Sequence, residues 1–221
     1  MLWATVVKGI SVEISSQQRT AEWFQARLGK VTASRVADVV ATTKSGYASS
    51  RANYMAELVA ERLTGKSAER FVSSAMRWGT DTEPAARVAY EIISGAIVKE
   101  TGLVDHPRIE MSGASPDGLI GTDGLVEIKC PNTSTHIDTL LLQEVPERYY
   151  TQIQWQLACT DRKWCDFVSF DPRMPENMQV FVTKVTRDMV AIGKLETEVS
   201  IFLGELNDKV NTLISIFGRD K

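Results

Sequence analysis

The sequence predicts an α/β protein in which a central β-sheet is flanked by helices. Apolar residues recur at helical spacing towards both ends of the chain, whereas apolar runs of strand length lie between them. A sheet covered by helices is a common solution for burying such segments. The 221 residues, 43% of them apolar and 24% charged, suffice for a substantial core. Since no repeat or linker interrupts the pattern, we expect one domain over residues 1–221.

Four helices are expected in the first half of the chain, and each has a start or stop signal. Thr20 is a candidate N-cap, Gly29 and Gly65 are candidate terminators, and Pro84 suits the first turn of a helix. The small, polar segment 42–50 between two of these helices is expected to be a loop. The expected helices cover residues 20–28, a segment that begins near Thr32, residues 51–64, and a segment from Thr82 to about Ser94.

Strands are expected in the middle of the chain, and two more helices are expected in its second half. The helices cover residues 146–160 and 187–217, and Gly204 is a candidate interruption of the second. An apolar stripe on this last helix serves either the core or a subunit interface; its members are Leu195, Val199, Phe202 and Leu206. Apolar runs predict strands at residues 97–99, 103–104, 165–170 and 179–185.

The segment around Asp117 and the following strand is the strongest functional signal. Asp117 lies in a Ser-Pro-Asp-Gly turn, and Glu127, Ile128 and Lys129 follow on an apolar strand. Because alternate side chains of a strand share a face, Glu127 and Lys129 project together while Ile128 points into a core. Two carboxylates suit Mg²⁺, and a lysine beside them can orient or deprotonate a water molecule. The pattern alone also fits a solvated strand face.

A turn between the two acids decides whether they share a face. Gly121-Thr122-Asp123-Gly124 is a hairpin signal. A three-residue loop with Gly124 left-handed would pair Gly121 with Leu125 and would place Asp117 opposite Lys129, on the face of Glu127. A two-residue loop at Asp123-Gly124 would turn Asp117 to the other face. The site hypothesis therefore predicts the three-residue loop.

Glu83 is a third candidate acid. It is expected in the opening turn of a helix, where a carboxylate complements the helix dipole. In the alternative interpretation it completes a two-metal site, which would clamp the attacking and leaving oxygens of an in-line displacement.

Arg27, Thr32 and Ser34 form a possible phosphate pocket. Hydroxyls and the free N–H groups of a helix start donate to phosphate, and an arginine adds a charge-assisted contact. The simpler interpretation is an exposed arginine beside a helix N-cap.

Two glutamines and two basic residues complete the candidates. Gln152 and Gln156 share one face of a largely apolar helix, where they would bind a phosphate or a water molecule, or would form a polar helix face. Lys44 and Arg51, in or beside the polar loop, are either solvated charges or contacts to a DNA backbone.

Composition limits the class of protein only loosely. The net charge of −3 indicates no general basicity, but a local field is what matters for binding nucleic acid. We find no signal-peptide pattern at the N-terminus and no run of membrane-spanning length. The three cysteines form no C-x-x-C pair, and the two histidines are expected in surface loops and cannot make a zinc site alone.

Six short blocks in the chain resemble the phage lambda exonuclease family, the YqaJ-like viral recombinase nucleases. They follow the order of that family and span nearly the whole chain. The blocks are Trp23–Gly29 with Thr32–Ser34, Trp78-Gly79 with Glu83, Ser115–Gly118, Glu127–Pro131, Gln152–Gln154 and Asp171–Met174. The last block has no chemical role that we can assign beyond a turn.

The resemblance implies a restriction-endonuclease-like core of the PD-(D/E)xK type. It also implies 5′→3′ degradation of one strand of a DNA duplex from its end, with release of mononucleotides and a remaining 3′ single strand. By position, Asp117 and Glu127 would bind two Mg²⁺ ions with the Ile128 carbonyl, and Mn²⁺ is expected to substitute. Glu83 would bind the second ion, and Lys129 would activate water with help from Gln152.

The resemblance also implies contacts to DNA and to other proteins. Arg27, Ser34 and Ser115 would hold the 5′-terminal phosphate, Met76 would be an apolar wedge at the end base pair, and Lys44 a basic loop residue. Members of the family form a ring-shaped homotrimer around DNA and work with a single-strand annealing protein. The expected location is the cytoplasm of a bacterial host, with a phage or prophage gene. An endonuclease on the same core and a non-catalytic DNA-binding scaffold are the competing hypotheses.

Overall fold

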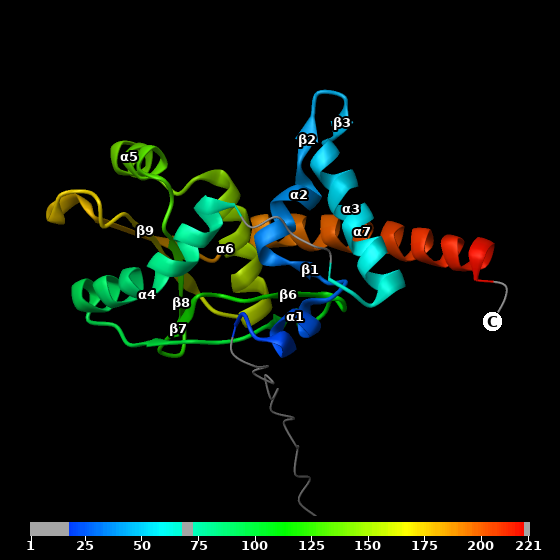
Figure 1. Cartoon of the computed structure of the whole chain (residues 1–221), viewed down its shortest axis with the longest axis horizontal. Helices are drawn as coiled ribbons and strands as arrows, with labels where there is room; N and C mark the ends of the chain where they lie inside the picture. Colours follow the sequence, from blue (N-terminus) through cyan, green and yellow to red (C-terminus); the bar gives the residue numbers. More distant parts are fainter. Residues whose placement is uncertain (1–17, 68–72, 219–221) are drawn as a thin grey trace, which may run out of the picture.

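A mixed five-stranded sheet forms the centre of the molecule (Figure 1), and the expected α/β class is confirmed. The computed structural model describes residues 18–67 and 73–218; the expectation about a signal peptide concerns residues outside these ranges. Strands β8 and β9 run parallel and the other neighbours antiparallel. In order across the sheet the strands are β10 (Val180–Thr186), β9 (Trp164–Phe170), β8 (Gly124–Lys129), β7 (Gly118–Ile120) and β4 (Val98–Lys99).

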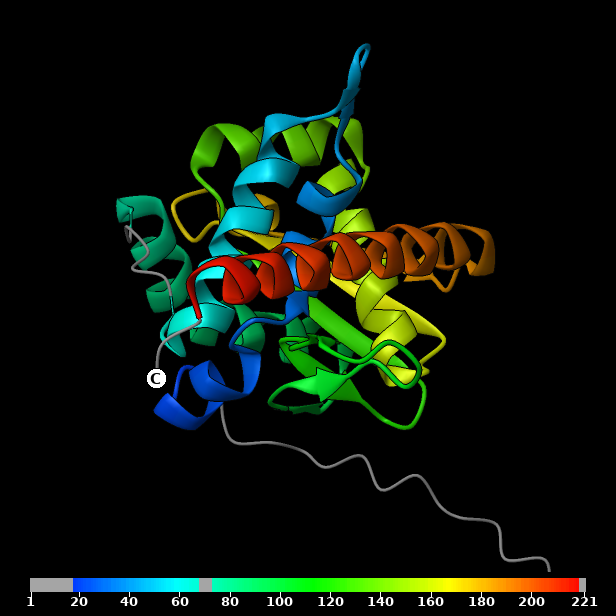
Figure 2. The same ribbon diagram turned by 90° about the vertical axis from the view of Figure 1, so that its right-hand side faces the viewer.

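Two smaller sheets lie beside the central one. The first has the order β1 (Val31–Thr32), β6 (Ser112–Ala114) and β5 (Val104–Asp105). The second is a hairpin of β2 (Thr42–Thr43) and β3 (Gly46–Tyr47), which projects from the body of the molecule (Figure 2). The prediction of a loop over residues 42–50 was therefore wrong, because Thr42 pairs with Tyr47 and the next helix already begins at Ser49.

The early helices follow their capping signals. In α1 (Ala21–Arg27) the Thr20 hydroxyl accepts from the Trp23 N–H at 3.3 Å, as an N-cap should. After a 3₁₀ turn, η1 (Ala33–Arg35), comes the short helix α2 (Val36–Val40), and then α3 (Ser49–Thr64). Gly29 and Gly65 end α1 and α3 with φ values of 67° and 66°, the left-handed conformation that glycine accepts without a steric penalty.

Helix α4 (Ser74–Ser94) begins eight residues before the start that Thr82 predicted. The Ser73 hydroxyl caps it by accepting from the Met76 N–H at 3.1 Å, and Pro84 lies inside the helix on its exposed side. Buried contacts of Ala86 and Tyr90 with the sheet keep the helix in place despite the backbone hydrogen bond that Pro84 removes. Glu83 consequently lies in the middle of a helix, not in an opening turn.

Three helices follow in the second half of the chain. They are α5 (Thr133–Leu142), which the sequence did not predict, α6 (Glu147–Thr160) and α7 (Met189–Phe217). Helix α7 continues through Gly204 and crosses the outside of α2, α3 and α6 (Figure 2). The stripe of Leu195, Val199, Phe202 and Leu206 is buried against Tyr54 and Trp155, so it belongs to the core.

The two faces of β8 have different environments. Val126 and Ile128 pack with Tyr90 of α4, as the alternation of the strand predicted for Ile128. Leu125 packs with Ile153 and other residues of α6 on the opposite face. Glu127 has the same parity as Leu125, and the strand therefore directs its carboxylate towards α6.

The hairpin between β7 and β8 has a three-residue loop, but not in the predicted register. Ile120 pairs with Gly124, and Gly121 is the left-handed residue with a φ of 50°. The predicted pairing of Gly121 with Leu125 was therefore wrong. Continuing the observed register by one pair places Asp117 opposite Glu127 instead of Lys129. The shift is by an even number of positions, so the acids still share a face.

A distant tryptophan explains the observed register. A Cβ atom on Gly124 would lie 2.2 Å from the Trp164 ring, which packs directly on the Gly124 backbone. Gly124 is therefore a strand residue whose missing side chain makes room for the indole.

We expect Gly124→Ala to lower the free energy of unfolding by about 1–3 kcal/mol, because the methyl group collides with the Trp164 ring. Gly193→Ala in α7 is the matched control, since a Cβ atom on Gly193 would meet no other atom within 4 Å. It should raise the free energy of unfolding by about 0.5–1 kcal/mol. Urea unfolding measures both changes, and equal midpoints for Gly124→Ala and the wild type would contradict the packing argument.

Candidate active site

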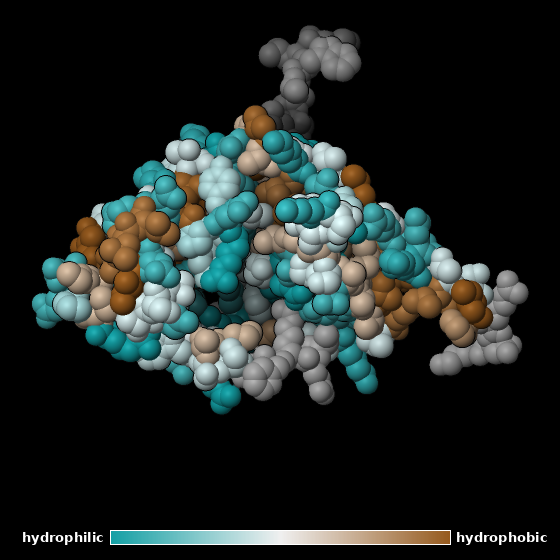
Figure 3. All heavy atoms as spheres, turned by 90° about the horizontal axis from the view of Figure 1, so that it is seen from above, coloured by the Kyte–Doolittle hydropathy of each residue, from teal (hydrophilic) through white to brown (hydrophobic). Residues whose placement is uncertain are grey.

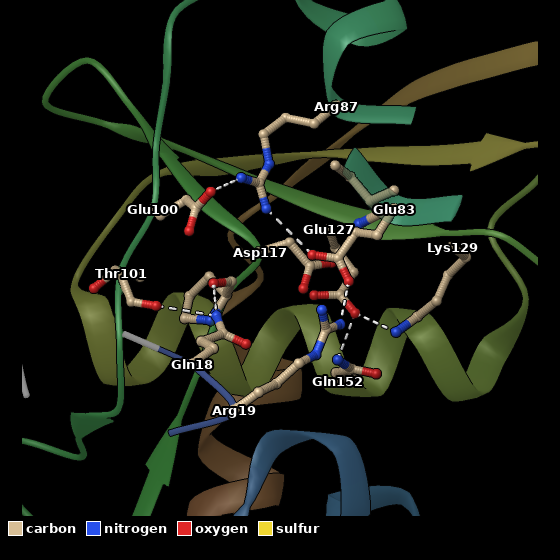
Figure 4. A network of polar contacts seen from close by, with 12 residues as sticks. Gln18, Arg19, Glu83, Arg87, Glu100, Thr101, Asp117, Glu127, Lys129 and Gln152 are labelled. Carbon is tan, nitrogen blue, oxygen red and sulfur yellow. Dashed lines mark hydrogen bonds and ion pairs between the residues drawn. The ribbon is translucent and has the colours of Figure 1, made fainter. Parts of the chain in front are cut away.

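Glu127 is the buried centre of the site, and its carboxylate is 1% exposed. The Lys129 ammonium donates to Oε1, which also accepts from Gln152 Nε2 at 2.5 Å (Figure 4). Gln156 Nε2 donates to Oε2 at 2.6 Å. The two glutamines that share a face of α6 thus both bind this carboxylate. The sequence paired them but did not reveal their common acceptor.

Asp117 lies beside this centre in a half-buried position. Its Oδ2 accepts from the Ile128 N–H at 2.7 Å, which fixes it against β8. Burial raises the pKa of the Asp117 carboxyl well above its usual range, and the charges of Glu127 and Glu83 raise it further. Burial alone would lower the pKa of Lys129, but the neighbouring Glu127 and Asp117 raise it on balance. Lys129 is therefore a charged donor in this arrangement.

Glu83 faces the same site from α4, and arginines hold both of its oxygens. Arg19 donates to Oε2 at 2.5 Å and Arg87 to Oε1 at 3.2 Å (Figure 4). Arg87 also pairs with Glu100. Sequence reasoning missed both arginines, because nothing in the spacing of Arg19 indicates that it meets a residue of α4.

The donors at this site suit a hard divalent cation. Asp117, Glu127 and the Ile128 carbonyl offer oxygen ligands, and a cation would neutralise part of the charge that Glu127 and Glu83 place beside Asp117. Within residues 18–67 and 73–218, no three histidine, cysteine, aspartate or glutamate side chains converge to hold a metal ion by themselves. The remaining ligands would have to be the carbonyl, water and substrate phosphate, an arrangement that Mg²⁺ favours.

The residues of the expected phosphate pocket lie together. Ser115 Oγ accepts from Trp23 Nε1 at 3.0 Å and from Arg27 at 3.3 Å. Arg27 also donates to Thr32 Oγ1 at 3.3 Å, and the Thr32 and Ser34 hydroxyls are 3.5 Å apart. The Arg27 guanidinium covers the Trp23 ring at 4.1 Å. Because η1 is only one turn long, the pocket depends on these side chains and not on a helix dipole.

The three remaining candidates do not join the acids. Lys44 is exposed in the two-residue turn of the β2–β3 hairpin, and Met76 is 52% exposed in the first turn of α4. Arg51 is 7% exposed, pairs with Glu205 at 2.7 Å and lies over the Tyr47 ring at 4.0 Å. These contacts give Arg51 a role in the packing of the hairpin and α3 against α7.

The Asp171–Met174 block forms a buried ionic cluster. Asp171 is fully buried and accepts from Thr133 Oγ1 at 2.7 Å and Arg173 Nε at 2.7 Å. The Arg173 guanidinium lies 4.3 Å from the centre of the Trp78 ring and also donates to the Pro131 carbonyl at 3.3 Å. The block thus connects the end of β9 to the segment after β8 and to α4.

The two histidines are buried, contrary to the prediction that they lie in surface loops. His136 lies in α5 and bonds to Ser169 at 2.7 Å, and the His106 ring stacks on Trp155 with 4.9 Å between the ring centres. Both side chains therefore serve the packing of the fold.

None of the helices in the described ranges is long and apolar enough to cross a membrane.

The family model described as "YqaJ-like viral recombinase domain" matches residues 22–163. The chain belongs to this family. The matched range contains the phosphate pocket, Glu83, Asp117, the β8 residues and both glutamines. No curated protein sequence matches the chain.

Two crystal structures of an alkaline exonuclease from Laribacter hongkongensis, LHK-Exo, are similar to this member of the YqaJ-like family. One of them is a complex with dAMP. Each is 54% identical, covers 90% of this chain and 99% of its own, and superimposes with a TM-score of 0.85. A phage-related exonuclease from Haemophilus somnus is 16% identical with a TM-score of 0.68, covering 83% and 96% of the two chains, and it supports the fold alone. The restriction-endonuclease-like fold is thereby confirmed.

We expect Asp171→Asn to lower the free energy of unfolding by about 1–3 kcal/mol, since it removes charge-assisted hydrogen bonds from a buried group. Burial raises the pKa of Asp171, but the bonds from Arg173 and Thr133 outweigh it and lower the pKa from 3.8 to about 2. A lowered folded-state pKa stabilises the protein above pH 3.8 and loses this effect as the pH falls towards about 2. The difference from the wild type should therefore shrink over that window in urea unfolding.

Asp161→Asn is the matched control for this series. The Asp161 side chain is 89% exposed and lies 3.4 Å from Arg187, so the loss should stay below about 1 kcal/mol. If the difference between Asp171→Asn and the wild type stayed constant from about pH 6 down to about pH 2, Asp171 would not be held as a carboxylate, because a lowered pKa requires that difference to depend on pH.

Proposed function

We propose that the protein is a Mg²⁺-dependent 5′→3′ exonuclease that degrades one strand of linear double-stranded DNA to mononucleotides and leaves 3′ single strands. One observation carries the proposal: the acids and the phosphate pocket are joined by the short segment Ser115-Pro116-Asp117. Ser115 belongs to the pocket of Arg27, and Asp117 is fixed against the strand of Glu127 and Lys129. The homology to an alkaline exonuclease supports a hydrolase of this kind and a dependence on metal.

The spacing of the two sites favours removal of one nucleotide from a 5′ end. Two residues of extended chain span about 7 Å, so a terminal phosphate held at Ser115 would place the next phosphodiester near Asp117. Arg27 and the hydroxyls of Ser34 and Ser115 supply the charge-assisted and neutral donors that a phosphate monoester needs. A pocket specific for a terminal phosphate excludes closed circles as substrates.

We assign the following roles at the acids. Asp117 and Glu127, with the Ile128 carbonyl, would bind two Mg²⁺ ions, and Glu83 would bind the second of them. Bound divalent ions would polarise the scissile phosphate and lower the pKa of the attacking water, and Mn²⁺ is expected to substitute for Mg²⁺. Lys129, charged in this arrangement, would orient that water and the phosphate. Gln152 would assist by holding the Glu127 carboxylate.

Exposed residues fit contacts beyond the active site. Met76 would wedge the end base pair and Lys44 would contact the DNA backbone. We further propose a ring-shaped homotrimer of one domain over residues 1–221, acting with a single-strand annealing protein in the cytoplasm of a bacterial host that carries the phage or prophage gene. Apolar side chains exposed near the end of α7 support such an interface (Figure 3); they are Ile214, Ile216 and Phe217.

Incubation of linear and covalently closed plasmid side by side, with and without Mg²⁺, tests the function. We expect digestion of the linear form only, and only with the metal. Cutting of the closed circle would instead indicate an endonuclease, and tight binding without cleavage in either Mg²⁺ or Mn²⁺ would indicate a scaffold. Lys129→Ala should reduce turnover by about 10²–10⁴-fold while gel-shift binding of the linear duplex is largely retained.

Arg27→Ala should abolish the preference for 5′-phosphorylated over 5′-hydroxyl ends. Loss of hydrogen bonds to a charged phosphate is worth about 1.5–3 kcal/mol, or roughly 10–150-fold in kcat/KM for the phosphorylated substrate. Arg108→Ala is the control, since the Arg108 side chain is 67% exposed and pairs with Glu196 outside the site. An unchanged end preference in Arg27→Ala would remove the phosphate pocket from the mechanism.

A further inference from the structure

Residues 18–20, directly before α1, form a short strap across the edge of the active site. Gln18 Nε2 donates to the Thr101 carbonyl at 3.0 Å and to the Pro116 carbonyl at 2.7 Å (Figure 4). Pro116 directly precedes Asp117, so this side chain fastens the strap to the backbone that carries a catalytic acid. Thr20, on the other side, caps the helix that carries Arg27. The strap therefore runs between the phosphate pocket and the acids.

Arg19, in the middle of the strap, has a left-handed backbone with a φ of 69°. Few residues other than glycine and asparagine adopt this conformation without strain, and such strain is concentrated at functional sites. Here the conformation coincides with a specific contact, because the guanidinium reaches the Glu83 carboxylate at 2.5 Å. Figure 4 shows the guanidinium among Glu83, Asp117 and Gln152.

We infer that Arg19 competes with the second divalent cation for Glu83 and thereby sets the affinity of the site for that cation. The inference rests on the proposed two-ion nuclease site. Glu83 has two carboxylate oxygens, and Arg19 and Arg87 occupy one each. Because each oxygen already accepts from a guanidinium, a cation that binds Glu83 meets the positive charge of both arginines.

Of the two arginines, Arg19 is the one that dissociates from Glu83 when the cation binds. Its side chain is 47% exposed, whereas that of Arg87 is 19% exposed and has a second partner in Glu100. Releasing Arg19 into water therefore costs less desolvation and breaks one ion pair instead of disturbing two. With Arg19 in place, its positive charge lies beside Glu83 and offsets part of the repulsion between Glu83 and the other carboxylates.

Binding of Mn²⁺ alone, without DNA, tests the inference by electron paramagnetic resonance or calorimetry. The variant is Arg19→Asn, because asparagine accepts a left-handed backbone but carries no charge. We expect the weaker of the two Mn²⁺ ions to bind roughly 2- to 10-fold more tightly than in the wild type, with the stronger ion little changed. Arg108→Asn, which removes the same charge at a distance, should change neither affinity.

A double-mutant cycle separates competition at Glu83 from a general effect of charge. In a Glu83→Gln background, Arg19→Asn should no longer alter Mn²⁺ affinity, because the contested ligand is gone. The inference would be overturned if Arg19→Asn raised the Mn²⁺ affinity equally in both backgrounds. It would also be overturned if Arg19→Asn failed to raise that affinity when Glu83 is present. Circular dichroism of each variant shows that it is folded.

The result of the Mn²⁺-binding experiment is independent of the plasmid test. Should the wild type fail to degrade linear DNA, the proposed function falls. Should the wild type degrade it while Arg19→Asn leaves both Mn²⁺ affinities unchanged, only the role of Arg19 falls.

Discussion

The hydrogen bonding of the buried Glu127 carboxylate is the interaction on which the candidate active site depends. An ionised carboxylate removed from water costs several kcal/mol unless donors surround it, and Glu127 is 1% exposed. One donor, Lys129, comes from its own strand, and the other two come from Gln152 and Gln156 on α6. Helix α6 must therefore present two amides to the sheet at the same time as Ile153 and Leu157 pack into the core. The fold and the site are constrained by the same contact.

The short covalent link between Ser115 and Asp117 is a second constraint on the site. Ser115 and Asp117 are separated by Pro116, whose fixed φ limits the freedom of the segment. The Ser115 hydroxyl is held by Trp23 and Arg27, and the Asp117 carboxylate by the Ile128 N–H. A phosphate bound at one end and a phosphodiester cut at the other would thus be positioned by the same three residues. Such preorganisation lowers the entropy that a reacting substrate has to lose.

Local patterns were sufficient for the helices with capping signals, the strand of Glu127 and the shared face of the acids. They failed where a distant residue decides the outcome. The register of the β7–β8 hairpin depends on Trp164, which occupies the space above Gly124. The start of α4 is a different case, because a local cap is present at Ser73 and the prediction took Pro84 for the first turn instead. No spacing in the sequence could have paired Arg19 with Glu83, since their contact forms only in the folded chain.

Arg51, a candidate DNA contact, is another residue whose surroundings could not be predicted from the sequence. A basic residue beside a polar segment has no local feature that distinguishes a solvated contact from a packing role. Tyr47 and Phe202 provide the distinction, because two aromatic rings lie under the Arg51 guanidinium at 4.0 and 5.1 Å. Both rings belong to elements that only the folded chain brings to this arginine.

The position of Glu83 depends on how helix α4 packs on the sheet. It packs on the face opposite to the one that Glu127 occupies. Asp117, Glu127 and Lys129 are fixed by β7 and β8, but Glu83 reaches them from a helix that packs on Val126 and Ile128. Arg173 lies over Trp78 of this helix and is held by the buried Asp171, which also bonds to Thr133 after β8. The ionic cluster therefore links α4 to the strand that carries Glu127. This link gives the Asp171–Met174 block a structural role, because it helps to hold the helix of Glu83 beside the strand of Glu127.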